Sequence, residues 1–153
     1  MSKMAALSSR VLRQYAAPPY SITEAGEIQV LLVTTRGRRD WIIPKGWPIR
    51  NLTAAATVAR EAYEEAGLIG TVVGDEPIGC FRYEKPKNLR RVAVFEVSVF
   101  LFAVERQLRK WPEKSERETR WLAPEVAAAL VGREGLADVL RQVAAREVLI
   151  RAR

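Results

Sequence analysis

The sequence contains no histidine and a single cysteine, Cys80, among its 153 residues. Without histidine the chain can use neither a Ser-His-Asp triad nor a histidine-ligated zinc ion, and one cysteine can form neither an intrachain disulfide nor a cysteine zinc site. A bound metal would therefore have oxygen ligands, which favours magnesium, manganese or calcium. The single cysteine is also typical of a reducing compartment, so we expect a cytoplasmic protein.

Long hydrophobic runs are also absent. The longest apolar stretch, near Val92 to Val104, is interrupted by Glu96 and Ser98 and is too short and mixed for a membrane span. The first ten residues, MSKMAALSSR, lack the apolar core of a signal peptide. We therefore expect a protein that has no membrane partner.

Basic residues outnumber acidic ones by 25 to 18, which gives a net charge of +7. This excess predicts an anionic partner such as a polyphosphate or nucleic acid, although a solvated basic surface would have the same composition. No pattern of interleaved aromatic and basic residues typical of RNA binding stands out, so nucleic acid is the less favoured partner. The basic residues that could contact a polyanion are Arg10, Arg13, Arg36, Arg38, Arg39, Lys45, Arg50, Arg82, Lys85, Lys87, Arg90 and Arg91.

The order of apolar segments predicts a single α/β domain over residues 1–153, with helices packed on a mixed β-sheet. Residues 1–20 are expected to form an N-terminal arm, because the pair Pro18-Pro19 prevents a continuous helix there. Strands are predicted at 28–34, 41–43, 71–73, 77–83, 92–104 and 118–122, and helices at 54–66, from 124, and from 136 to about 149. Thr53 is a suitable N-cap for the helix at 54–66, and Gly67 suits the positive φ after its end.

Three acids lie close together on the helix at 54–66. At about 100° per residue, Glu61, Glu64 and Glu65 fall on the side opposite the small residues that can pack on a sheet. Pairing of Arg60 with Glu64 on a solvated helix face would explain part of this pattern. However, clustered carboxylates bind hard divalent cations, which would relieve their repulsion. The loop before the helix, PKGWP at 44–48, contains a glycine that would let backbone come close to a ligand.

The spacing of these residues resembles the Nudix box. In that motif a glycine, an acid, an Arg-Glu pair, a Glu-Glu pair and a final glycine follow one another at fixed intervals. The matching residues here are Gly46, Arg60, Glu61, Glu64, Glu65, Gly67 and Leu68, with Ala62 in the apolar position after Arg60-Glu61. One position departs from the motif, because Leu52 stands where its first glutamate is expected.

The resemblance implies a Nudix-type α/β/α sandwich, with the box helix on one side of the sheet and the C-terminal helix on the other. It also implies hydrolysis of a diphosphate linkage with Mg²⁺ or Mn²⁺. By this resemblance Glu61, Glu64 and Glu65 would be catalytic metal ligands and candidates for the base, and Arg60 would orient a carboxylate. A further acid outside the box often contributes in this family, and Glu113 and Glu116 are the candidates. Alternatively, Glu113 and Glu116 are ordinary charged residues of a loop.

The variant WIIPKGWP at 41–48, with WPE at 111–113 and Arg120-Trp121, looks like the branch that hydrolyses diphosphoinositol polyphosphates and diadenosine polyphosphates. Lys45 and Arg50, which flank Gly46, are the expected phosphate contacts. Trp47 could shape the pocket or stack on a base. Two alternatives stay open at this point: removal of pyrophosphate from an RNA 5′ end, and a non-catalytic ligand sensor that lost activity with Leu52.

Overall fold

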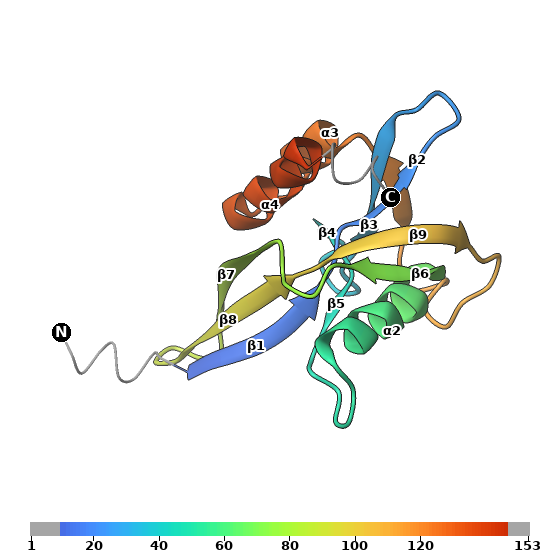
Figure 1. Cartoon of the computed structure of the whole chain (residues 1–153). Coiled ribbons are helices and arrows are strands. Elements are labelled where there is room, and N and C mark those ends of the chain that lie inside the picture. The colour runs from blue at the N-terminus through green and yellow to red at the C-terminus, as the bar shows by residue number, and fades with distance from the viewer. Residues whose placement is uncertain (1–9, 147–153) are drawn as a thin grey trace.

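β3 (Ile28–Thr34) is an interior strand of its sheet, and both of its faces are buried. Val30 and Leu32 belong to a core cluster shared with the C-terminal helices, whereas Leu31 and Val33 belong to a second cluster shared with the helix at 54–66. Figure 1 shows these helices on opposite sides of the strands. The expected layering of helix, sheet and helix is therefore confirmed.

The computed structural model describes residues 10–146. Its other strands are β1 (Arg10–Ala16), β2 (Pro19–Ile22), β4 (Trp41–Ile42), β5 (Lys45–Gly46), β6 (Leu68–Val73), β7 (Gly79–Pro86), β8 (Val92–Val99), β9 (Leu101–Gln107) and β10 (Thr119–Leu122). The helices are α2 (Ala54–Ala66), α3 (Pro124–Leu130) and α4 (Glu134–Ala145). The predicted continuation of the last helix toward Leu149 lies outside the described residues. Within the described part of the chain, no helix is both long and apolar enough to cross a membrane.

The strands form two mixed sheets rather than the single sheet expected. One has the order β5-β1-β8-β7, and the other has the order β10-β3-β2-β9-β6 with β4 paired to β3. The predicted strand at 92–104 divides at Phe100, so that β8 lies in the first sheet and β9 in the second. β8 pairs in parallel with β1, and β9 pairs in parallel with β2. The break between β1 and β2 lies opposite the break between β8 and β9, and it contains Pro18, which has no N–H to donate to a neighbouring strand.

The expected N-terminal arm is wrong for residues 10–20. β1 pairs in parallel with β8 along its whole length, from Arg10 opposite Ala93 to Ala16 opposite Val99. β2 begins at Pro19 and pairs with both β3 and β9. The two prolines do prevent a helix, as expected, but they separate two strands. Residues 1–9 lie outside the described part of the chain.

α2 has the ends that the sequence predicts. The Thr53 side chain accepts a hydrogen bond from the Ala56 N–H at 3.1 Å, and Gly67 adopts a φ of 69° just beyond the last turn. Val58, Ala62 and Ala66 are buried against the strands. Thr57 and Glu65 are also buried, so the helix has a second covered face, and this face forms part of the candidate site.

Candidate active site

A cleft of about 590 Å³ lies between the β5 loop, α2 and the segment that precedes β10. Its lining includes Lys45, Gly46 and Trp47 from the loop at 44–48, and Glu61 and Glu65 from α2. Glu113 and Arg117, which are far away in sequence, line the same cleft. Of the motif residues, Gly46, Glu61 and Glu65 thus meet in one cleft.

The three acids of α2 do not share one environment. Glu61 and Glu65, one helical turn apart, face the cleft, and Glu65 is only 3% exposed. Glu64 instead lies outside the cleft lining, where Arg60 contacts it at 3.3 Å. The expected i,i+4 ion pair between Arg60 and Glu64 therefore forms, and it lies outside the cleft that Glu61 and Glu65 line.

Glu61, which is half-buried, and Glu65, which is buried, form an acidic pair. Burial raises the pKa of Glu65 to about 9, against the opposing effect of the nearby Arg117 guanidinium. Burial also raises the pKa of Glu61, although the hydrogen bond that Glu65 makes to it opposes the shift. Among the described residues, Glu65 Oε1 is a buried oxygen without a hydrogen-bond partner. An oxygen in this state is suited to a cation or a proton.

Gly46 allows the β5 loop to approach this pair. A Cβ atom at position 46 would overlap Glu61 Cδ and would lie 2.7 Å from both Cγ and Oε1 of that side chain. Only glycine leaves room for the Glu61 carboxyl group at this point. The sequence predicted that Gly46 lets the backbone come close to a ligand; in the structure Gly46 also lets the backbone come close to the Glu61 side chain.

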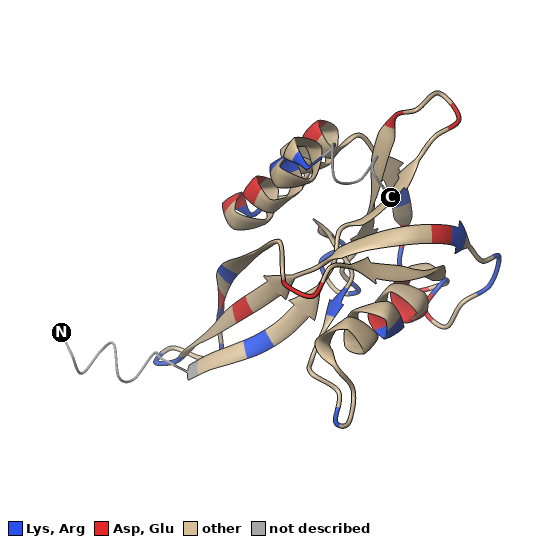
Figure 2. Ribbon diagram, viewed as in Figure 1, with Lys and Arg blue, Asp and Glu red and all other residues tan. Residues whose placement is uncertain are grey.

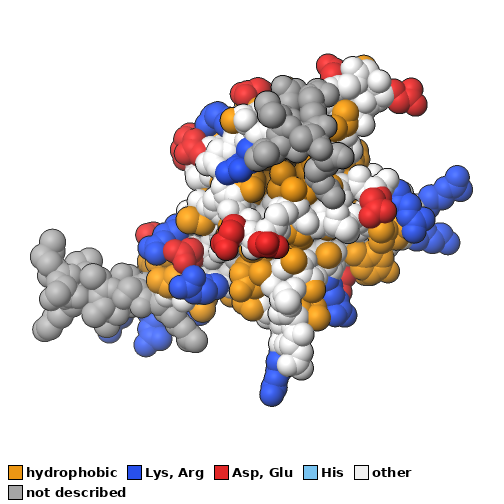
Figure 3. All heavy atoms as spheres, viewed as in Figure 1, with side chains coloured by type: hydrophobic (Ala, Val, Ile, Leu, Met, Phe, Trp, Pro, Cys, Tyr) orange, Lys and Arg blue, Asp and Glu red, His pale blue; other side chains and the backbone are white. Residues whose placement is uncertain are grey.

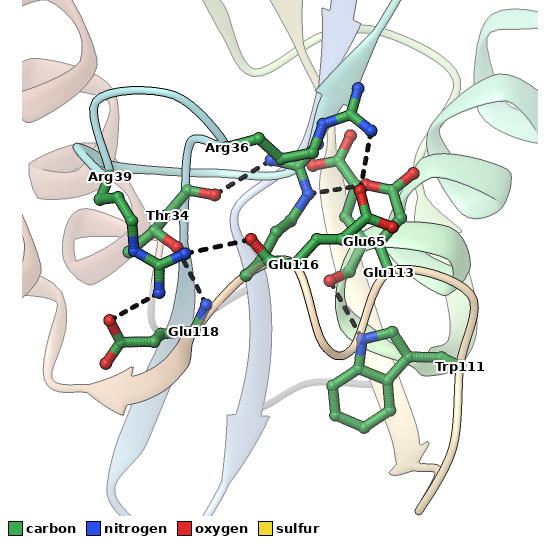
Figure 4. Close-up of polar contacts among 9 residues, drawn as sticks. Thr34, Arg36, Arg39, Glu65, Trp111, Glu113, Glu116 and Glu118 are labelled. Atoms are coloured by element: carbon green, nitrogen blue, oxygen red, sulfur yellow. Dashed lines mark hydrogen bonds and ion pairs between the residues drawn. The ribbon is translucent and has the colours of Figure 1, made fainter.

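The segment 107–118 holds the C-terminal end of α2 and brings Glu113 to the cleft. Trp111 Nε1 donates to the Glu65 carbonyl oxygen at 3.2 Å, and Glu113 N donates to the Glu64 carbonyl oxygen at 3.0 Å. Glu113 accepts a hydrogen bond from Arg117 Nε at 2.7 Å. Figure 4 shows Glu113 near Glu65, with Trp111 below them. The candidate Glu116 contacts Arg36 at 3.0 Å.

Four of the twelve basic residues named from the sequence pair with acids outside the cleft. Arg13 and Arg82 both contact Glu96, Arg38 contacts Asp40, and Arg39 contacts Glu118. Figure 2 shows acidic and basic positions interspersed along the ribbon, and Figure 3 shows the same mixture over the face in view. The net charge therefore does not form a single basic surface on this face.

Of the basic residues named from the sequence, three line the cleft: Arg36, Lys45 and Lys85. Arg50 is exposed and lies outside the cleft lining, as does Leu52, which is 38% exposed. Lys87, Arg90 and Arg91 are exposed in the loop after β7. The side chain of Arg10 lies outside the described part of the structure.

Lys45 is the cation closest in sequence to Gly46, and it is held in place. Its Nζ donates to the Tyr83 hydroxyl group at 3.1 Å, and that hydroxyl group donates to Gln14 Oε1 at 2.8 Å. Burial lowers the pKa of Lys45 to about 8, against the attraction of the Glu65 carboxylate. The Lys45 amine lines the cleft and could therefore bind an anion there.

Sequence reasoning did not identify Arg117, Tyr83, Gln14 or Phe95 as residues of the cleft. The spacing of Glu113 and Arg117 is a signal for an ion pair, but nothing local places that pair beside α2. Tyr83 and Phe95 come from paired strands, β7 and β8, whose register is a tertiary property. Their contribution could be found only from the fold.

Comparison with known proteins agrees with this geometry. A family model described as NUDIX domain matches residues 16–143. Nudix hydrolase 13, mitochondrial, from Arabidopsis thaliana is 27% identical over 87% of this chain and 68% of its own length. Nudix hydrolase 12, mitochondrial, from the same organism is 30% identical over 76% of this chain and 58% of its own length. The chain spans well under three quarters of either relative.

Solved structures share the fold. A Caenorhabditis elegans Ap4A hydrolase, solved as a binary complex, has a TM-score of 0.66 and 18% identity, covering 88% of this chain and 96% of its own. The Escherichia coli dihydroneopterin triphosphate pyrophosphohydrolase has a TM-score of 0.65 and 22% identity, covering 87% of this chain and 97% of its own. With the family match over residues 16–143, these findings show that the chain belongs to the NUDIX domain family, the family of the Nudix hydrolases.

Proposed function

We propose that this protein is a metal-dependent pyrophosphohydrolase that cleaves the diphosphate linkage of a polyanionic small molecule. The observation that carries the proposal is the acidic pair of half-buried Glu61 and buried Glu65, which faces Gly46 in a cleft that also contains Lys45. Membership of the Nudix hydrolases supports cleavage of a phosphoric anhydride. Diphosphoinositol polyphosphates and diadenosine polyphosphates are the proposed substrates. The single cysteine supports a reducing compartment, and we propose the cytoplasm.

The proposed metal is Mg²⁺ or Mn²⁺, and the donor atoms suit it. Among residues 10–146, no three histidine, cysteine or acidic side chains gather closely enough to form a complete metal cage. Glu61 and Glu65 nevertheless place hard oxygen donors together, and Glu65 Oε1 has no partner among these residues. Mg²⁺ is commonly held by one or two carboxylates together with substrate phosphates and water. Two acids at this position are therefore sufficient.

Glu61 and Glu65 would hold the metal, which would neutralise charge on the diphosphate. Lys45 would bind a phosphate oxygen, and Arg117 would keep Glu113 near the pair. In the reaction, the oxygen of water forms a bond to phosphorus, the bridging P–O bond breaks, and the leaving phosphate takes the electron pair. A carboxylate of the Glu61–Glu65 pair would accept the proton of that water.

Glu64 and Arg60 have a secondary role in this proposal. Their contact lies outside the cleft lining, on the surface of α2. We propose that they stabilise the helix that carries Glu61 and Glu65. Glu113 accepts from Arg117 through Oε1 at 2.7 Å, so its other carboxylate oxygen could join the metal ligands.

A hydrolysis panel tests the proposal. Purified protein is incubated with Mg²⁺ or Mn²⁺ and with a diphosphoinositol polyphosphate, a diadenosine polyphosphate, a nucleoside diphosphate sugar or triphosphorylated RNA, and phosphate and nucleotide release are measured. We expect release from one of the first two substrates, abolished by EDTA and by Glu61→Gln. Release from RNA alone would favour the RNA 5′-end activity, and metal-dependent binding without turnover would favour a sensor.

A further inference from the structure

The hairpin of β7 and β8 ends in a turn that we call the cationic tip, residues 87–91 with the sequence KNLRR. The last pair of opposed residues in the hairpin is 86 with 92, so the cationic tip lies beyond the sheet. Lys87 N donates to the Arg91 carbonyl oxygen at 2.9 Å. Asn88 Oδ1 accepts from the backbone N–H groups of Arg90 and Arg91 at 2.8 and 3.0 Å. These bonds give the cationic tip a defined backbone shape.

Leu89, at the centre of the cationic tip, is 105% exposed. Among the large apolar side chains of the described residues, the next most exposed is Val126 at 53%. Leu89 therefore contributes no packing to either core cluster. Transfer of such a side chain from water into an apolar environment is favourable, so contact with an apolar phase would stabilise it.

The other long side chains of the cationic tip are positively charged. Lys87, Arg90 and Arg91 are exposed, and within residues 10–146 none of the three forms an ion pair. No acid occurs in the sequence from position 85 to position 95. All three cations also lie outside the lining of the catalytic cleft. They are thus free to meet an anionic surface outside the protein.

The opposite end of the molecule is acidic. In Figure 1 the loop between β2 and β3 lies far from the loop between β7 and β8. That loop, at 23–27, contains the exposed Glu24 and Glu27 and no basic residue, and Figure 2 shows its acidic positions in red. An anionic surface would attract the cationic tip and repel this loop, so the protein would approach it in one orientation.

We infer that the cationic tip docks on an anionic lipid surface, with Leu89 among the lipids and the three cations against phosphate-bearing headgroups. Cations alone would suit any polyanion, but a fully exposed leucine between them gains only from apolar contact, which a phosphate backbone does not offer. The sequence-based expectation of no membrane partner rested on the lack of a spanning segment, and docking of this kind needs none. The inference goes beyond the proposed function and does not depend on it.

Cosedimentation of the whole chain with vesicles tests the inference without any substrate. One set of vesicles contains equal parts phosphatidylcholine and phosphatidylserine, and the other contains phosphatidylcholine alone. We expect binding to the first set only, and its loss at about 1 M salt, where the Debye length falls to about 3 Å. The single-stranded RNA poly(U) is titrated in parallel as a different polyanion.

Charge reversal tests the electrostatic part. Arg90→Glu/Arg91→Glu should weaken binding to the phosphatidylserine vesicles about 25-fold or more, because each cation close to an anionic surface contributes about fivefold. Arg106→Glu/Arg109→Glu is the matched control, because it changes the net charge equally at exposed positions near the end of β9. It should weaken binding by less than about threefold, since charges far from the surface are screened.

Leu89→Asn tests the apolar part, because it leaves every charge in place. It should weaken binding to the same vesicles about tenfold. Val126→Asn, which replaces an exposed apolar side chain of α3, is the matched control and should bind as the wild type does. Circular dichroism should be the same for all four variants, because every substituted side chain is exposed.

Failure to bind phosphatidylserine vesicles, or equal binding to both sets, would overturn the inference. Binding that survives in Arg90→Glu/Arg91→Glu would also overturn it. If Leu89→Asn weakens vesicle binding no more than Val126→Asn does, while poly(U) binds tightly and requires Arg90 and Arg91, the cationic tip is a nucleic-acid contact and the lipid surface is refuted.

Discussion

Replacing Glu65 by glutamine should stabilise the metal-free protein at neutral pH while removing its activity. Glu65 is 3% exposed, and burial raises its pKa from an ordinary 4.5 to about 9. Between these values the folded protein binds a proton that the unfolded chain has lost. The free energy of unfolding therefore falls as pH rises from 4.5 to 9. Below pH 4.5 both states are protonated and this destabilising contribution disappears.

The size of the effect follows from the same values. Each pH unit contributes about 1.4 kcal/mol, so the roughly 2.5 units between 4.5 and 7 give an upper limit of about 3 to 4 kcal/mol at pH 7. Glutamine removes this dependence, because it has no proton to gain. Its amide can still donate a hydrogen bond toward Glu61, as the protonated Glu65 does.

Urea denaturation in EDTA at pH 5.5, 7 and 8.5 measures this difference. The wild type should lose stability relative to Glu65→Gln as pH rises. Glu64→Gln is the control for stability, because Glu64 lies in a surface pair with Arg60 and should change stability by less than about 1 kcal/mol. Parallel pH dependence of the wild type and Glu65→Gln would refute the reasoning that Glu65 is a buried acid held protonated in the metal-free fold.

Three further predictions concern the surroundings of the pair. Gly46→Ala would push a methyl group into the Glu61 carboxyl group and should lower kcat about a hundredfold; a variant with normal kcat would show that this approach is unimportant. Trp111→Phe removes the donor to the Glu65 carbonyl oxygen and should cost about 1 kcal/mol of unfolding free energy, measured in urea with Trp41→Phe as the control; equal losses would argue against the contact. Leu52→Glu should change turnover by no more than about twofold, because Leu52 is exposed outside the cleft lining; a sharp increase in turnover would support a sensor that lost its acid.

The box helix is the part of the fold that sequence predicts best. Its start at Thr53 and its end before Gly67 depend on capping contacts within a few residues, and both are as expected. The division into two sheets could not be predicted in the same way. It depends on two breaks that lie side by side, one at Pro18 between β1 and β2 and one at Phe100 between β8 and β9, although these residues are more than 80 positions apart in the sequence. Such long-range register leaves no local pattern.

The candidate site shows the same limit. Helical periodicity places Glu61, Glu64 and Glu65 on one side of α2, but it cannot say which of them faces the β5 loop. The approach of Gly46 selects Glu61, and the burial of Glu65 follows from packing against segments distant in sequence. Arg117 and Tyr83 reach the cleft through the same tertiary contacts. The motif therefore predicts the chemistry, and the fold shows which of its residues face the cleft.

The most direct test of the central claim is the initial rate of diphosphate hydrolysis as a function of Mg²⁺ concentration, for the wild type and for Glu65→Gln. The account predicts a saturable dependence of the wild-type rate on Mg²⁺ and a loss of roughly a hundredfold or more in the folded variant. A wild-type rate that is unaffected by EDTA, or a Glu65→Gln variant that turns over normally, would contradict the assignment of the Glu61–Glu65 pair as the catalytic centre.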